Sequence, residues 1–91
     1  MIHELKILPE YYESVKNGEK RFEIRKNDRS YKVGDLIKLN EFDRDYTGRS
    51  SVYEIIYKLE GGSYGLEKGW CILSIKPWQT ETFLGITVLP R

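Results

Sequence analysis

Apolar and polar residues alternate along most of the chain, and a period of two is typical of β-strands with one buried face. Runs of this kind are bounded by glycine, proline and clusters of polar residues, which favour turns. The predicted strands are residues 3–8, 20–25, 36–42, 51–59, 70–75 and 82–89.

One segment follows a helical spacing instead. Pro9 suits the first turn of a helix, because its missing N–H would have no partner there. Tyr11, Tyr12 and Val15 are three and four residues apart, so they share one face. Gly18 supplies the left-handed residue that ends many helices. The sequence therefore predicts one short helix over residues 9–17.

Polar or glycine-rich segments at residues 27–34, 43–48 and 61–65 separate the later strands and predict loops. One short N-terminal helix with five to six mostly antiparallel strands describes an α+β domain built around a small barrel. We expect a single domain over residues 1–91, with 77–91 as a C-terminal extension that holds the last candidate strand. The predicted core consists of Leu5, Ile7, Val15, Phe22, Ile24, Ile37, Leu39, Ile55, Leu73 and Ile75.

The 91 residues carry a formal net charge of only +1, so no global field attracts nucleic acid or a membrane. The charge is unevenly distributed, however. Six basic and two acidic residues lie between Lys20 and Lys32, which gives this segment +4 and leaves −3 for the rest. A local basic site is the feature that composition supports.

Several kinds of chemistry lack their residues. Cys71 is the single cysteine, which excludes an intramolecular disulfide and favours a buried thiol. His3 is the single histidine, at a terminus we expect to be mobile, so a Ser-His-Asp arrangement has no support. The loop at residues 62–65 lacks the spacing of a nucleophile elbow or a phosphate-binding loop. We expect no metal and no cofactor.

The N-terminus has neither a basic start nor the apolar stretch of a signal peptide. No apolar run approaches the roughly 20 residues of a membrane span. We therefore expect a cytoplasmic protein without membrane contact. The oligomeric state stays open.

Residues 18–25 contain the pattern G-x-K-x-x-E-x-R, formed by Gly18, Lys20, Glu23 and Arg25. A valine-glycine-aspartate turn follows at residues 33–35, and a third segment follows at residues 64–70. These motifs resemble the ASCH branch of the PUA-like superfamily, including a small uncharacterised bacterial and phage family in that group. The resemblance covers roughly residues 2–76.

The resemblance implies a PUA-like pseudo-barrel whose cleft, between helix and sheet, binds RNA or a nucleotide. Physical chemistry agrees, because arginine offers a planar fork to phosphate or guanine and a face that stacks on a base. The candidate binding residues are Gly18, Lys20, Arg21, Glu23, Arg25, Lys26, Arg29 and Tyr64.

Plainer interpretations of the same residues remain open. The Arg-Glu-Arg row can be a ladder of solvated ion pairs, each contributing about 0–1 kcal/mol. Tyr64 can pack on a strand instead of stacking on a base. Strict alternation places Lys20 opposite Glu23 and Arg25, whereas the motif predicts that all three share one concave site.

Three functions follow. The first is a non-enzymatic module that binds RNA or a nucleotide. The second is implied by the resemblance: some ASCH proteins are amidohydrolases of a modified nucleoside such as acetylated cytidine, in which a lysine at the Lys20 position acts with a threonine three residues later and a downstream glutamate. Glu23 occupies that threonine position, and a carboxylate does not replace a hydroxyl nucleophile. The third is a protein-interaction module whose tail, at residues 82–89, pairs with a partner through its strand edge.

Overall fold

The computed structural model describes residues 1–78, 81–83 and 86–88. It contains one helix and seven strands in these residues. In chain order they are β1 (Ile2–Ile7), α1 (Pro9–Lys16), β2 (Phe22–Lys26), β3 (Leu36–Asp43), β4 (Asp45–Glu60), β5 (Trp70–Pro77), β6 (Glu81–Phe83) and β7 (Ile86–Val88).

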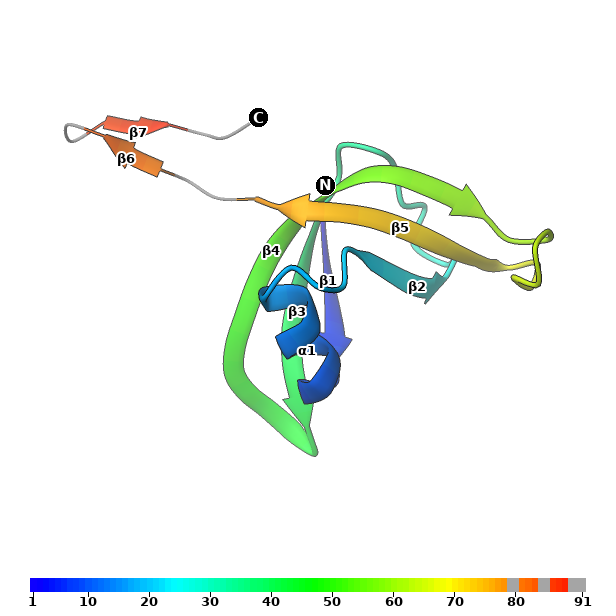
Figure 1. Cartoon of the computed structure of the whole chain (residues 1–91), viewed down its shortest axis with the longest axis horizontal. Helices are drawn as coiled ribbons and strands as arrows, with labels where there is room; N and C mark the ends of the chain where they lie inside the picture. Colours follow the sequence, from blue (N-terminus) through cyan, green and yellow to red (C-terminus); the bar gives the residue numbers. More distant parts are fainter. Residues whose placement is uncertain (79–80, 84–85, 89–91) are drawn as a thin grey trace.

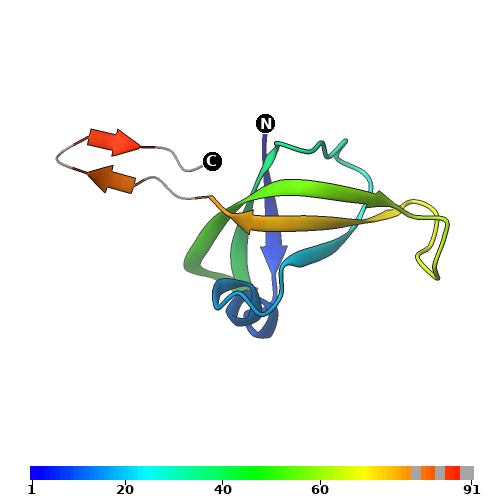
Figure 2. The same ribbon diagram turned by 45° about the horizontal axis from the view of Figure 1, so that its top comes forward.

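Five strands form one sheet in the order β1-β3-β4-β5-β2. β1 runs parallel to β3, and the other neighbours are antiparallel. Figure 1 shows this sheet curled around α1, with the long strand β4 bending through it. β1 and β2 are the two edges of the sheet. The turned view in Figure 2 shows both strands on the same side of the long strands β4 and β5. The expected barrel is thus confirmed as a curled half-barrel with one short helix.

The core lies on the concave face of this sheet, beneath α1. Every second residue of β3 and β5 points inward, and Ile37, Leu39 and Leu73 are fully buried. Tyr12 and Val15 close the core from the helix, as their spacing predicts, whereas Tyr11 is exposed. Cys71 is buried, and burial raises the pKa of its thiol. Eight of the ten predicted core residues are buried.

The other two predicted core residues, Phe22 and Ile24, are 42% and 49% exposed, so this prediction was wrong. The register between β2 and β5 explains the error. Glu23 pairs with Leu73 across the ladder, and directly opposite residues in a sheet point to the same face. Because Leu73 points into the core, Glu23 does too, and its side chain is only 3% exposed.

Two connections also differ from expectation. The chain reverses at Arg44, whose φ of 67° is left-handed, so β4 already begins at Asp45 within the predicted turn. A β-bulge between Asn40 and Phe42 accommodates the longer hairpin. In the tail, β6 and β7 form an antiparallel pair where one strand was predicted. Residues 84, 85 and 89 of that prediction lie outside the described residues.

The sequence suggested that His3 lies at a mobile terminus. Instead, His3 is buried in β1. Its Nε2 lies 2.8 Å from the Asp35 carboxylate and carries the proton, because a carboxylate only accepts. Its ring also meets the Tyr31 ring edge-on at 4.8 Å. The hydrogen bond from His3 holds the pKa of Asp35 below its ordinary value. His3 is therefore a structural residue.

Candidate binding cleft

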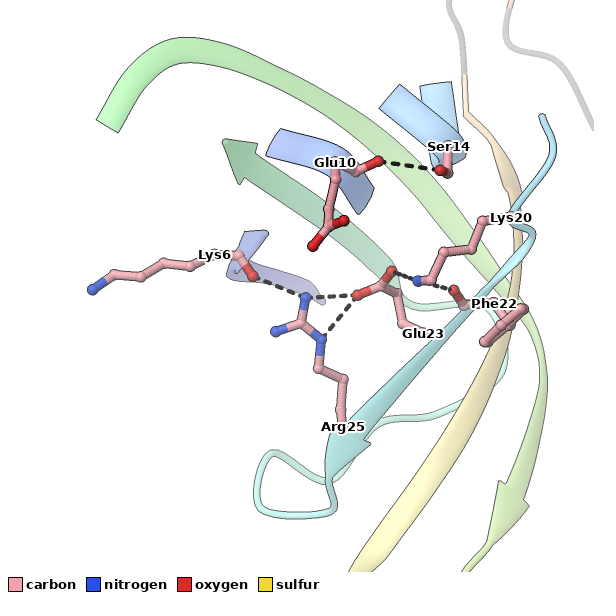
Figure 3. Close-up of polar contacts among 7 residues, drawn as sticks. All are labelled: Lys6, Glu10, Ser14, Lys20, Phe22, Glu23 and Arg25. Carbon is pink, nitrogen blue, oxygen red and sulfur yellow. Dashed lines mark hydrogen bonds and ion pairs between the residues drawn. The ribbon is translucent and has the colours of Figure 1, made fainter. Parts of the chain in front are cut away.

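Glu23 is a carboxylate in the core with a cation on each side (Figure 3). Its Oε2 pairs with the Lys20 ammonium, and its Oε1 accepts hydrogen bonds from Arg25 Nη2 at 2.6 Å and Nε at 3.1 Å. Burying a lone carboxylate costs several kcal/mol, and paired hydrogen-bonding cations offset that cost. The structure thus brings Lys20, Glu23 and Arg25 into one cluster.

Arg25 is fixed from two directions. Besides its contacts with Glu23, its Nη2 donates to the backbone carbonyl of Lys6 at 2.9 Å. That carbonyl belongs to β1, so Arg25 bridges the two edge strands of the half-barrel. Figure 3 shows its remaining terminal nitrogen, Nη1, directed away from Glu23, with no contact drawn to it. The Lys6 side chain extends away from the cluster in the same view.

Lys20 comes before β2, which resolves the conflict between strict alternation and the motif. Outside the strand its side chain can fold back, and its Nζ donates to both Glu23 and the Phe22 carbonyl. The ammonium also lies 4.8 Å from the centroid of the Phe22 ring and 5.7 Å from that of Tyr11. Lys20 thus links the carboxylate to two exposed aromatic rings.

These groups border a cavity of about 480 Å³, here called the Glu23 cleft. Its lining residues are Lys6, Ile7, Leu8, Tyr11, Lys20, Phe22, Glu23, Ile24 and Arg25. The apolar walls come from the end of β1, the start of α1 and the outer face of β2. Three cations and one carboxylate give the lining a formal charge of +2. The cleft therefore combines exposed apolar surface with fixed positive charge.

A second cavity of about 760 Å³ adjoins the first and is here called the Arg29 groove. Lys6 and Arg25 line both cavities. Arg29 contributes a further cation, and its Nη1 donates to the Glu4 carbonyl of β1 at 3.0 Å. The lining residues are Glu4, Leu5, Lys6, Arg25, Arg29, Asn40 and Tyr46, again with a formal charge of +2.

The other predicted site residues lie around this region or away from it. Lys26 lines a smaller cavity with Arg25, Arg29 and Tyr31. Burial raises the pKa of the Tyr31 phenol there, although the nearby arginines oppose this. Gly18 (φ 84°) forms the turn after α1, and its carbonyl accepts from Arg21 Nε. Both line a separate pocket beyond Lys20.

Tyr64 is apart from the cluster. It lies in the loop between β4 and β5, 94% exposed, and does not line the Glu23 cleft. The two views show this loop extending away from α1 (Figures 1 and 2).

Sequence reasoning missed three parts of the cleft: the Lys6 carbonyl, the wall formed by Tyr11 and the exposed position of Phe22. Tyr11 had a misleading signal, because its spacing from Val15 placed it on the inward face of the helix, whereas it is exposed. The Lys6 carbonyl had none, since every residue has one and only the closure of β1 toward β2 selects it.

Within the described residues, no helix is long and apolar enough to cross a membrane. In the same part of the chain, no three His, Cys, Asp or Glu side chains gather where they could hold a metal ion.

The fold and the site define a small β-rich half-barrel whose open edge forms a basic, partly aromatic cleft. The chain belongs to the family described as Domain of unknown function (DUF3850), whose model matches residues 2–75. That range includes α1, the first four strands of the sheet and most of β5, but not β6 and β7.

The chain is also similar to the "Uncharacterized 12.9 kDa protein in GpA 3'region" of Escherichia phage P2. The two are 45% identical over 49 residues, which cover 53% of this chain and 45% of the phage protein. The chain thus matches less than half of that relative's length.

Proposed function

We propose that the chain is a PUA-like binding module of the ASCH type whose Glu23 cleft takes a nucleotide, free or within RNA. One observation carries the proposal. A buried carboxylate fixes Lys20 and Arg25 beside two exposed aromatic rings, at a cavity with net positive charge. Fixed donors bind a polar ligand with less loss of side-chain entropy than free ones.

The aromatic walls suit a base. Tyr11 and Phe22 are both nearly half exposed and line the same cavity. Stacking of a base on an aromatic side chain contributes about 1–3 kcal/mol and tolerates any base, because each has a π-face. A base between these rings would displace water from apolar surface that the fold itself leaves uncovered.

Arg25 can orient the ligand through a hydrogen bond. The sequence suggested that Arg25 forms a fork toward guanine. Its Nε and Nη2 already donate to Glu23 and the Lys6 carbonyl, so these two nitrogens cannot form that fork. Nη1 keeps two N–H donors, and the guanidinium plane can still stack. We therefore assign Arg25 one directed contact to a base or phosphate.

The Arg29 groove suits the phosphate. Lys6 and Arg29 add positive charge directly beside the cleft, and Lys26 lies next to Arg29. Phosphate contacts of this kind give affinity that falls with rising salt.

The amidohydrolase alternative is less well supported by the contacts. Both Glu23 oxygens are occupied by cations, so the carboxylate is not free to move a proton. Lys20 donates to Glu23 and to the Phe22 carbonyl, and these two contacts fix its ammonium at the cleft. No hydroxyl stands at position 23 to act as the nucleophile.

The test is a chemical-shift titration of the isotope-labelled protein with nucleoside monophosphates, acetylated cytidine and short RNAs. The proposal expects the largest shifts at residues 6–8 and 20–25. Shifts confined to the loop at residues 61–69, or none with any ligand, would refute it. Conversion of acetylated cytidine over time would favour the hydrolase instead.

A further inference from the structure

A second group of cations surrounds a cavity on the other side of Lys20, at the end of α1. This cavity of about 210 Å³ is here called the Lys16 pocket. Its lining residues are Val15, Lys16, Gly18, Lys20, Arg21, Tyr53, Ile75, Lys76 and Pro77. Four of them are cations and none is acidic, in a chain whose total charge is +1.

Two of these four cations have carboxylate partners. Lys20 pairs with Glu23, and Lys76 lies 3.8 Å from Glu54. Lys16 and Arg21 form no ion pair within the described part of the chain, and both are exposed. Like charges around one cavity repel, and an anion between them removes that cost.

Helix capping explains only part of this arrangement. Lys16 stabilises the negative end of α1 in the last turn, as cations commonly do. Arg21 and Lys76 lie on the following loop and on β5, where that explanation does not apply. The Arg21 carbonyl accepts from Ile75 N at 3.0 Å, which fixes this loop against β5. The backbone therefore holds the cations of three elements around one space.

A neighbouring cavity of about 350 Å³ adjoins the pocket and shares Lys16, Tyr53 and Pro77 with it. Ser50, Ser51 and the half-buried Trp78 line this extension. Burial raises the pKa of the Tyr53 phenol, which therefore adds no negative charge. Hydroxyls and an indole beside a group of cations match a sugar, a base and a phosphate.

We propose that the Lys16 pocket is a phosphate subsite, entered by a single-stranded nucleic acid that continues past Lys20 from the Glu23 cleft. Lys20 lines both cavities, so a strand crossing it remains next to positive charge throughout. The strand as the source of the phosphate rests on the proposed function, whereas the anion site rests on its own cations. A free phosphate ion is the other source of the same chemistry.

The test compares the wild type with Lys16→Gln/Arg21→Gln and with the charge-matched control Arg44→Gln/Lys68→Gln, whose residues are exposed and line neither cavity. Affinities for inorganic phosphate, a nucleoside monophosphate and a short single-stranded RNA are measured at several salt concentrations. In Lys16→Gln/Arg21→Gln we expect unchanged mononucleotide affinity and weaker RNA binding. The log–log salt slope for RNA flattens by about 0.7 for each lost phosphate contact. The control keeps the wild-type slope.

Other outcomes separate the two claims. If the salt slope of RNA affinity is unchanged in Lys16→Gln/Arg21→Gln, the pocket is not a subsite for a nucleic-acid strand. If that variant alone then loses binding of inorganic phosphate, the pocket is a site for free phosphate. If the wild type binds neither nucleotide nor RNA, the proposed function fails and the strand path fails with it. If inorganic phosphate then still changes the chemical shifts of the Arg21 and Lys76 amides, the claim of an anion site stands and the claim of a strand path does not.

Discussion

Glu23 is the residue on which the site depends. Its side chain is in the core because of the β2 register, and its charge is tolerable only because Lys20 and Arg25 reach it. The two cations are in turn held at the cleft because the carboxylate is there. In the proposed function, stability and binding therefore both depend on Glu23.

Glu23→Gln should destabilise the fold by about 2–3 kcal/mol. The amide keeps the shape but removes the charge that balances two adjacent cations. This loss in the free energy of unfolding is at or below the low end of the range for breaking a buried ion pair, because about a fifth of each cation's side chain is exposed. Urea unfolding measures it, with exposed Glu67→Gln as the control, expected within about 0.5 kcal/mol of the wild type. Equal stability of the two variants would contradict the role of Glu23.

Asp35→Asn tests the second carboxylate, which joins His3 to the turn before β3. The pKa of Asp35 is lowered below its ordinary value of 3.8, chiefly by the hydrogen bond from His3. A lowered pKa stabilises the fold above the unfolded value, and this gain is lost as the pH falls through the folded one. We expect a deficit of about 1 kcal/mol at pH 5 that shrinks below pH 3.8.

The comparison for Asp35→Asn is Asp43→Asn, whose carboxylate is exposed. This control should show no such pH-dependent deficit. A deficit in Asp35→Asn that is the same at pH 5 and pH 3 would show that the ionised carboxylate is not the stabilising group.

At the scale of elements, β2 is the edge strand where local pattern and tertiary structure disagree. Phe22 and Ile24 face outward while Glu23 and Arg25 face inward, opposite to the usual rule for a half-buried strand, and Lys26 alone follows that rule. The result is a cleft wall made of Phe22 and Ile24 over a charged floor.

Ile24→Ala should therefore cost about 1 kcal/mol or less, since about half of its surface is already in water. Leu73→Ala, in the neighbouring strand β5, should cost about 2–5 kcal/mol because Leu73 is fully buried. Thermal or denaturant unfolding of the two variants checks the difference. Equal costs would mean that β2 presents its other face to the core.

The sequence predicted most strands because alternation decides the outcome where one face is buried, as in β3 and β5. The same rule failed for β2, since Phe22 and Ile24 look like core residues until the pairing with Leu73 is known. The cluster of Lys20, Glu23 and Arg25 was anticipated from the motif, but the Lys6 carbonyl that completes it was not. Long-range register and backbone groups leave no local signal.

At the scale of the whole molecule, side chains bridge the open edge of the half-barrel. Arg25 and Arg29 donate to the Lys6 and Glu4 carbonyls, two residues apart on β1. Such capping protects a free strand edge from pairing with other chains. Arg25 borders both the Glu23 cleft and the Arg29 groove, and Arg29 borders the groove, so the proposed ligand site lies where the two edges of the sheet meet.

Arg25→Lys tests the central claim most directly, through the affinity of the variant for the nucleotide that the wild type prefers. Lysine keeps the charge but loses the planar group that contacts Glu23 and the Lys6 carbonyl and that, in the proposed function, also contacts the ligand. We predict a loss of about 1.5–3 kcal/mol in binding free energy, the usual contribution of one hydrogen bond from a charged donor. Arg44→Lys, an exposed control, should bind as the wild type does. Wild-type affinity in Arg25→Lys, with its stability intact, would contradict a nucleotide site at the Glu23 cleft.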